Sequence, residues 1–252
     1  MNTNILIGVL LMFSFTLLSE QTSSSMQFYQ QRDKDNPNHI YFGPEFFCYD
    51  LNVHVDHIQV NDTKCFLGLR LGYEYLKPDA FYGAIDLLSA GSNRGFEASV
   101  QNKKISEESG ITGFGNLEVR LGYTAAVDRW LLSPFLGIGG YAMGQNHHVG
   151  FQQEMAYATG GIRTQAEANK HLNIGVNLKI FRSLSTTTKY IIGCTTFKES
   201  HNMWGGEIGV PFIWWMGSSQ QWDAQLEPYF LKFQFSESQN LYGIRLLFGY
   251  HF

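Results

Sequence analysis

Histidine and aspartate gather in a few polar stretches of the chain, where they could bind a metal ion or catalyse a hydrolysis. Imidazole and carboxylate groups held close together can coordinate a divalent cation or act as an acid–base pair. The candidates comprise an H-x-D-H run and three further histidines: His54, Asp56, His57, His147, His148 and His201. No spacing beyond that run recurs. We therefore interpret them as polar residues of surface segments and predict no catalytic residue, cofactor or metal ion.

A second set of charged residues lies inside segments that are otherwise apolar or rich in glycine. Its members are Arg70, Glu74, Asp86, Glu118, Arg120, Glu207 and Arg245. If these segments are strands around an enclosed interior, opposite charges would pair there and fill it. A charged pore constriction is the alternative. The large apolar residues Leu241 and Leu247 share the face of Arg245 and favour the filled interior.

Composition points to strands as the elements that position these residues. The 252 residues are 15% aromatic and 16% charged and include 26 glycines, which suits strands and tight turns better than helices. The formal net charge is −4, and no basic run is longer than Lys103-Lys104, which argues against a nucleic-acid partner. We therefore expect an all-β protein that binds no nucleic acid.

The clearest strand is the run LYGIRLLFGYHF at residues 241–252. One alternating set is large and apolar and the other is mostly small or polar, which is the period of a strand with two different faces. The run resembles the closing strand of bacterial outer-membrane β-barrels. In that family the terminal aromatic residue is an assembly signal, so the resemblance implies this role for Tyr250 and Phe252. It also implies the barrel-assembly machinery as a partner.

Similar alternation predicts ten strands, although eight or twelve also fit the pattern. Their ranges are 40–53, 64–75, 80–90, 115–126, 132–143, 155–165, 172–182, 203–215, 224–235 and 241–252. Short connections alternate with longer ones at 54–63, 91–114, 144–154 and 183–202. This alternation is the layout of an outer-membrane barrel, with short periplasmic turns and long outer loops.

The N-terminal segment predicts export. Its apolar run at residues 5–18 is too short to cross a bilayer as a helix and fits a secretory signal. We predict a cleaved signal peptide at residues 1–25, a periplasmic segment at 26–39 and an outer-membrane barrel at 40–252. Because a closed barrel satisfies every backbone polar group without helices, it can span the outer-membrane lipid bilayer, the expected partner.

Aromatic residues mark one predicted membrane interface. Beside the short turns lie Trp130, Trp214, Trp215 and Trp222, which predict a periplasmic girdle. The strand at 224–235 keeps its alternation only if a bulge at Glu227-Pro228 shifts its phase.

The cysteine count is odd, with Cys48, Cys65 and Cys194. Cys48 and Cys65 would lie near each other across the first hairpin but on opposite faces. A disulfide there is possible, but we expect free thiols.

We interpret the chain as a closed antiparallel transmembrane β-barrel with a structural, surface-interaction or narrow porin-like role and no catalytic activity. An extracellular or host ligand would bind the outer loops. One alternative is an outer-membrane hydrolase that uses the loop histidines and aspartates. A ten-stranded barrel with histidine and aspartate residues at its rim resembles the omptin proteases, although no omptin motif is present. The other alternative is a soluble lipocalin-like barrel with its apolar set turned inward around a ligand.

Overall fold

The protein is described by a computed structural model. It covers residues 35–55, 58–94, 97–100, 103–106, 109–145, 149–192, 195–200, 202–217, 220–234 and 238–252. The predicted signal peptide and most of the segment 26–39 lie outside these described residues. Within the described ranges, no helix has the length and apolar character that crossing a membrane requires.

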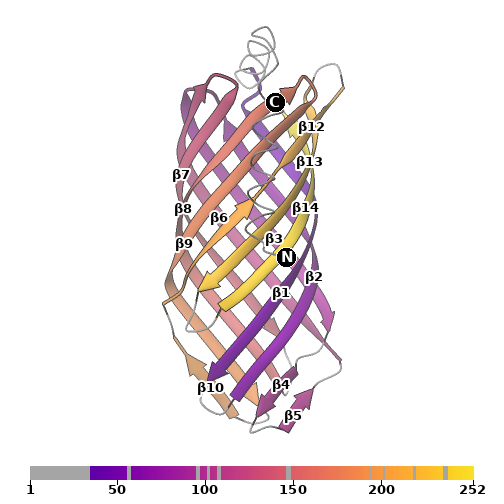
Figure 1. Ribbon diagram of the computed structural model, residues 1–252, viewed down its shortest axis with the longest axis vertical. Coiled ribbons are helices and arrows are strands. Elements are labelled where there is room, and N and C mark those ends of the chain that lie inside the picture. Colours follow the sequence, from indigo (N-terminus) through magenta and orange to yellow (C-terminus); the bar gives the residue numbers. More distant parts are fainter. Residues whose placement is uncertain are drawn as a thin grey trace, which may run out of the picture.

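The wall of one closed barrel consists of ten antiparallel strand positions, which we call staves (Figure 1). The barrel closes because β1 pairs with both β2 and β14. Nine staves are single strands: β1 (Asn38–Val55), β2 (Ile58–Leu76), β3 (Ala80–Arg94), β6 (Ser109–Val127), β7 (Trp130–Gln145), β8 (Val149–Asn169), β9 (Leu172–Ile192), β13 (Trp222–Gln234) and β14 (Ser238–His251). The tenth stave consists of β11 (Trp204–Gly209) and β12 (Phe212–Met216). The prediction of ten barrel strands is thus confirmed.

The tenth stave is divided by a proline. β11 and β12 keep one register against β13, where Gly209 pairs with Tyr229 and Phe212 pairs with Leu226. Pro211 lies between them and cannot donate a ladder hydrogen bond. Because the register continues across this gap, the two strands occupy the place of the single strand predicted at 203–215.

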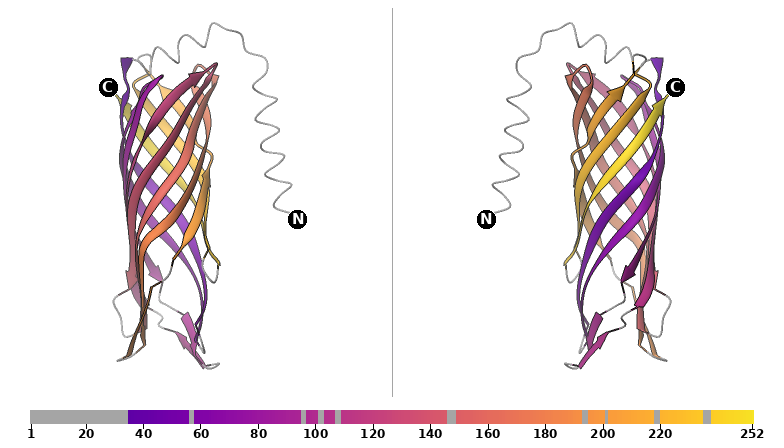
Figure 2. Two further views of the ribbon diagram at one scale, coloured as in Figure 1. Left: turned by 90° about the vertical axis from the view of Figure 1, so that its left-hand side faces the viewer. Right: turned by 90° about the vertical axis from the view of Figure 1, so that its right-hand side faces the viewer.

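The two ends of the barrel differ (Figures 1 and 2). The end that we call the turn end holds the short connections at 77–79, 128–129 and 170–171 and the C-terminal residue Phe252. The opposite loop end holds three short strands, β4 (Glu97–Val100), β5 (Lys103–Ser106) and β10 (Thr195–Glu199). In outer-membrane barrels the short turns face the periplasm.

The predicted long loops are mostly strand, which corrects the sequence-based boundaries. The β1–β2 hairpin stays paired as far as Val55 and Ile58. Residues 91–114 belong largely to β3, to the β4–β5 hairpin and to β6. Polar side chains on both faces hide the alternation from the sequence, while the backbone groups of neighbouring strands still pair.

The long strands carry the barrel beyond a bilayer. β8 and β9 contain 21 residues each. At about 3.3 Å per residue and a tilt of about 40°, such a strand rises roughly 50 Å along the barrel axis. A hydrocarbon core is about 30 Å thick. The loop end therefore projects well outside the membrane.

The apolar set of the strands faces outward. Leu69, Leu136 and Ile180 leave 67%, 75% and 71% of their surface exposed. A continuous apolar belt of this kind is stable against lipid and would aggregate in water. The soluble alternative, with the apolar set turned inward around a ligand, is therefore wrong.

Of the four predicted girdle tryptophans at the turn end, Trp214 and Trp222 are exposed on the outer face and Trp130 is half-buried. Trp215 is an exception and corrects the prediction. Its ring is buried inside the barrel, 4.6 Å from the ring of His251, because successive residues of a strand face opposite sides.

The prediction of a bulge at Glu227-Pro228 is wrong. β13 pairs with β14 in one register along its whole length, from Trp222 opposite Tyr250 to Gln234 opposite Ser238. Glu227 and Tyr229 are both buried on the inner face of this strand. The barrel interior accepts aromatic residues, so an aromatic side chain did not mark the lipid face here.

The interior is filled in layers. Two apolar clusters lie nearer the loop end, one with Phe47, Tyr49, Phe66 and Tyr229 and the other with Tyr141, Tyr157, Phe181 and Phe233. Phe114 packs against both. A third cluster fills the turn end with Leu76, Tyr82, Ala84, Leu131 and Phe135. Charged residues occupy the positions between these clusters along the strands.

The first hairpin contains a disulfide, which corrects the expectation of free thiols. Cys48 and Cys65 are directly opposite in the β1–β2 ladder and are bonded to each other. By alternation along the strands both side chains belong to the outward set, opposite to the inner set of Phe47 and Phe66, although Cys48 itself is only 7% exposed. Aromatic residues on both faces of β1 made its phase ambiguous in the sequence. Cys194 lies outside the described residues.

Replacing both Cys48 and Cys65 with serine should lower the free energy of unfolding by about 3 kcal/mol. The bond joins two residues with a sequence separation of 17. Removing a disulfide that closes a loop of similar length costs about 3 kcal/mol. Denaturant midpoints in detergent micelles measure the change. Reductant should lower the denaturant midpoint of the wild type to that of the double variant and should leave the midpoint of the double variant unchanged. Alkylation of Cys48 in the unreduced, folded protein would contradict the bond.

Candidate functional site

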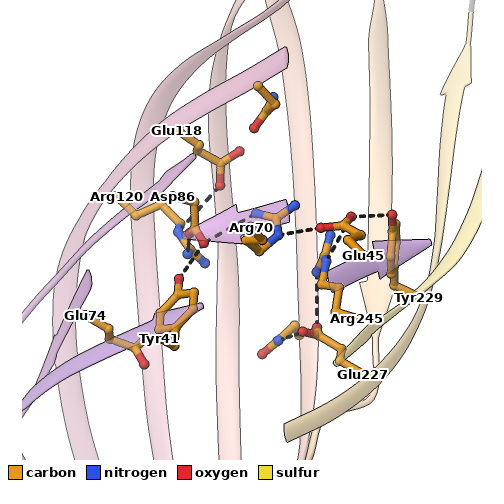
Figure 3. A network of polar contacts seen from close by, with 12 residues as sticks. Tyr41, Glu45, Arg70, Glu74, Asp86, Glu118, Arg120, Glu227, Tyr229 and Arg245 are labelled. Carbon is orange, nitrogen blue, oxygen red and sulfur yellow. Dashed lines mark hydrogen bonds and ion pairs between the residues drawn. The ribbon is translucent and has the colours of Figure 1, made fainter. Parts of the chain in front are cut away.

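Eight charged side chains form a closed ring of alternating sign inside the barrel, which we call the charge ring. Figure 3 shows the part of this ring that contains Glu118, Arg120, Asp86, Arg70, Glu45 and Arg245. In order around the ring they are Glu45, Arg70, Asp86, Arg120, Glu118, Lys179, Glu207 and Arg245. They come from β1, β2, β3, β6, β9, β11 and β14. Each member contacts an opposite charge on both sides, so the four cations and four anions cancel.

The first half of the charge ring is built from arginine forks. Arg70 Nε lies 2.6 Å from Glu45 Oε2, and its Nη1 lies 3.4 Å from Asp86 Oδ1. Arg120 Nη2 pairs with the other oxygen of Asp86, and its Nε lies 3.5 Å from Glu118 Oε1. Asp86 therefore joins two arginines from neighbouring strands, which fixes both guanidinium groups.

The second half returns to the starting residue. Lys179 Nζ lies 3.0 Å from Glu118 Oε2 and 2.8 Å from Glu207 Oε2. Arg245 Nη2 then lies 2.8 Å from Glu207 Oε1, and its Nε lies 3.4 Å from Glu45 Oε1. β7 contributes only glycine at this height, Gly137 and Gly139, which leaves room for the side chains of Arg120 and Tyr157.

Tyrosine hydroxyls satisfy further oxygens of the charge ring. Tyr229 donates to Glu45 Oε1 at 2.5 Å, Tyr157 donates to Glu118 Oε2 at 2.8 Å, and Tyr41 donates to Asp86. The Tyr41 ring lies across Gly72, where any Cβ would overlap it. The glycine at this position thus allows Tyr41 to reach the network.

Burial makes these contacts energetically important. The side chains of the charge ring expose between 1% and 18% of their surface. Burying charges costs several kcal/mol per ion unless partners and hydrogen bonds compensate. The alternating order provides two opposite partners to each charge, so the network is stable only when it is complete.

A second polar cluster lies toward the turn end. Arg163 Nη1 lies 2.5 Å from Glu74 Oε1, and Glu74 Oε2 lies 3.9 Å from His39 Nδ1. His39 and His251 both contact Asp223. This cluster connects β2 and β8 with β1, β13 and β14, which adjoin where the barrel closes.

Sequence reasoning selected most of the residues that meet in the interior. Six of its seven charged candidates are in the charge ring, and Glu74 is in the second cluster instead. It missed Glu45 and Lys179 of the charge ring, Arg163 and Asp223 of the second cluster, and the tyrosines. Strand phase could have found them, because Glu45 alternates with the outward Phe42, Pro44 and Phe46. The role of the network stays a prediction.

The outer-loop candidates are not tested by the structure. His54 lies in β1, but its side chain is outside the described part. Asp56, His57, His147, His148 and His201 all lie outside the described residues. Their prediction as polar surface residues therefore stays a prediction.

The space that remains between the inner side chains is small. A cavity of about 100 Å³ lies among residues of the charge ring and the loop-end clusters, including Arg70, Lys179 and Phe181. One water needs roughly 10–15 Å³ of cavity volume, so the cavity can hold several waters but no wide aqueous channel. Within the described part of the chain, side chains therefore fill most of the interior at this level.

A closed ladder with a lipid-facing apolar surface and short turns at one end defines the class: the chain is a multi-pass β-barrel of the bacterial outer-membrane type. No family model and no curated protein sequence matches it. Among solved structures it is similar to the outer-membrane protease OmpT from Escherichia coli, with a TM-score of 0.61, 6% identity, and coverage of 87% of this chain and 97% of that one.

Two autotransporter structures are also similar. The translocator domain of NalP from Neisseria meningitidis has a TM-score of 0.45 and 9% identity, covering 90% of this chain and 93% of that one. The beta domain of the Bordetella autotransporter BrkA has a TM-score of 0.47 and 9% identity, covering 86% and 99%. At these identities the likeness concerns the fold alone.

Proposed function

We propose that this barrel is a non-catalytic, non-conducting outer-membrane protein whose loop end binds an extracellular ligand. The observation that carries the proposal is the charge ring, whose paired side chains cross the interior between the apolar clusters of the loop end and the cluster of the turn end. Ions would have to break buried ion pairs to pass. A wet constriction, in contrast, would leave charges of one sign facing water.

The projecting loop end supports the binding role. On β8 and β9 the outward residues change from mostly apolar to mostly polar beyond the belt, as at Glu154, Arg182 and Ser185, which are exposed; Leu184 is an apolar exception. Polar walls that extend outside the membrane are rigid supports for the connecting segments, and binding residues are commonly carried on such supports. The barrel-assembly machinery, acting on Tyr250 and Phe252, is the partner that we propose for insertion.

Planar-bilayer recordings should show no stable conductance steps for the purified wild-type barrel, with a porin as the positive control. Glu154→Ala, on the outer face, should behave like the wild type. Reproducible channels whose ion selectivity shifts in Arg120→Ala would overturn the closed interior and support the porin-like role.

Adhesion assays test the binding role separately. Cells that display the wild type should bind host cells or matrix, and replacement of residues 97–106 by a short linker should reduce binding while heat-modifiable migration stays unchanged. Equal adhesion of the two strains would argue against this hairpin. Hydrolysis of a peptide or lipid substrate that is lost in His148→Ala would replace the proposal with the hydrolase alternative.

A further inference from the structure

Three buried metal-binding side chains meet outside the charge ring, near the turn end. His39, Asp223 and His251 come from β1, β13 and β14, where the first strand of the barrel joins the last two. Ligand atoms of all three lie within 4.8 Å of one another. His39 and His251 are directly opposite in the ladder. We propose that these residues bind a divalent transition-metal ion, for which Zn²⁺ is the natural probe.

The two imidazoles point the same nitrogen at one carboxylate. His39 Nε2 lies 2.9 Å and His251 Nε2 lies 2.8 Å from Asp223 Oδ2. His39 Nε2 is nevertheless too poorly aligned for a hydrogen bond, and Asp223 Oδ1 has no hydrogen-bond partner among the described residues. Buried polar atoms without partners are rare in proteins because each is costly. A cation bound between these atoms would satisfy both.

The donor set selects the class of ion. Two imidazole nitrogens and one carboxylate suit Zn²⁺ and neighbouring transition metals, whereas Ca²⁺ and Mg²⁺ prefer oxygen ligands throughout. Three protein ligands leave a fourth position for water. All three side chains are buried, with 5%, 1% and 9% of His39, Asp223 and His251 exposed, so bulk water would compete weakly.

The surroundings resemble the outer shell of a metal site. Metal-binding histidines commonly direct their second nitrogen at a carboxylate. His39 Nδ1 lies 3.9 Å from Glu74 Oε2, and Arg163 holds Glu74 at 2.5 Å. Gly249 of β14 lies beside the three ligands, and a Cβ there would overlap both His39 Nε2 and Asp223 Oδ2. The absence of a side chain at this position keeps the space open.

Ion binding requires a local movement. The two imidazole rings are stacked, with centroids 4.0 Å apart and planes at 9°. For both lone pairs to converge on one ion, the rings must rotate apart. The bound ion would then connect β1, β13 and β14 and hold the barrel closed. Because only the folded barrel presents the three ligands together, the ion would stabilise it against unfolding.

The test uses the purified full-length barrel after treatment with a chelator. Titration with Zn²⁺ should load one ion per barrel at micromolar free metal and should raise the unfolding midpoint. Co²⁺ should give the visible absorption band of a low-symmetry, four-coordinate ion. His251→Ala and Asp223→Asn should lose both the ion and the shift in midpoint. Glu74→Gln should weaken the affinity about 10–100-fold.

The matched control is His171→Ala, which removes an exposed histidine from a turn at the same end of the barrel. This variant should bind like the wild type. A wild-type barrel without stoichiometric Zn²⁺ and without the Co²⁺ band would overturn the proposal, whether or not the variants fold. So would binding that survives His251→Ala and disappears in a His147→Ala, His148→Ala double variant, because the ion would then belong to the loops.

Discussion

Asp86→Ala should lower the free energy of unfolding by about 3–5 kcal/mol, the cost of leaving a buried charge without its partner. Asp86 is the carboxylate between Arg70 and Arg120, and it also accepts the hydroxyl of Tyr41. Its removal would leave two guanidinium groups facing each other across one broken position of the charge ring. Denaturant midpoints of the folded barrel in micelles measure the loss.

The double variant Asp86→Ala, Arg120→Ala should be more stable than Asp86→Ala alone, because it removes one of the two buried cations that lost Asp86 as a partner. Arg70 keeps its contact with Glu45 in both variants. Glu154→Ala, on the exposed outer face of β8, is the control and should change stability by less than about 0.5 kcal/mol. Additive losses in the double variant would mean that the two side chains do not interact. A small loss in Asp86→Ala itself would indicate a wet interior, in which water screens the charges.

Leu69→Arg should destabilise the barrel in a membrane by about 2–4 kcal/mol, the cost of an arginine near the bilayer midplane on the lipid face of a barrel. Leu69 lies in the middle of the outward set of β2, between Leu67 and Leu71, with 67% of its surface exposed. Folding titrations in lipid vesicles measure this change.

Thr63→Arg provides the matched control on the same strand. Thr63 is exposed, and its position beyond Cys65 places it toward the loop end. The penalty for arginine falls to about 0–1 kcal/mol near an interface. Equal effects of the two substitutions would contradict the depth that we assign to Leu69, and no effect of either would show that β2 does not face lipid.

The outward set, the strand number and the class of barrel could be predicted from the sequence because lipid imposes one simple rule. Every second residue of a membrane strand must be apolar. The lipid-facing side of Leu67, Leu69 and Leu71 can therefore be assigned from this strand alone, without knowing which strands lie beside it. The rule ends where lipid ends. Beyond the belt both faces are polar, and the sequence placed loops where β1, β2, β8 and β9 continue as paired strands.

The inner set was predictable only as a set of residues. Period-two alternation placed Arg70, Asp86 and Arg245 on the inner face, but alternation says nothing about which inner residues meet. Those contacts depend on the register between strands and on closure of the barrel, which brings Glu45 of β1 against Arg245 of β14 across most of the chain length.

The same limit explains the residues that sequence reasoning misplaced. Cys48 and Cys65 form a disulfide because the hairpin register sets them opposite each other, and Trp215 is buried because β12 turns that residue inward. His39, Asp223 and His251 are far apart in sequence and meet only where β1, β13 and β14 adjoin. The sequence by itself determined which face of most strands meets lipid, since burial in lipid acts on one residue at a time; β1 and β13, which carry aromatic residues on both faces, are the exceptions. The tertiary structure alone decided the pairs, since pairing depends on the relative position of two strands.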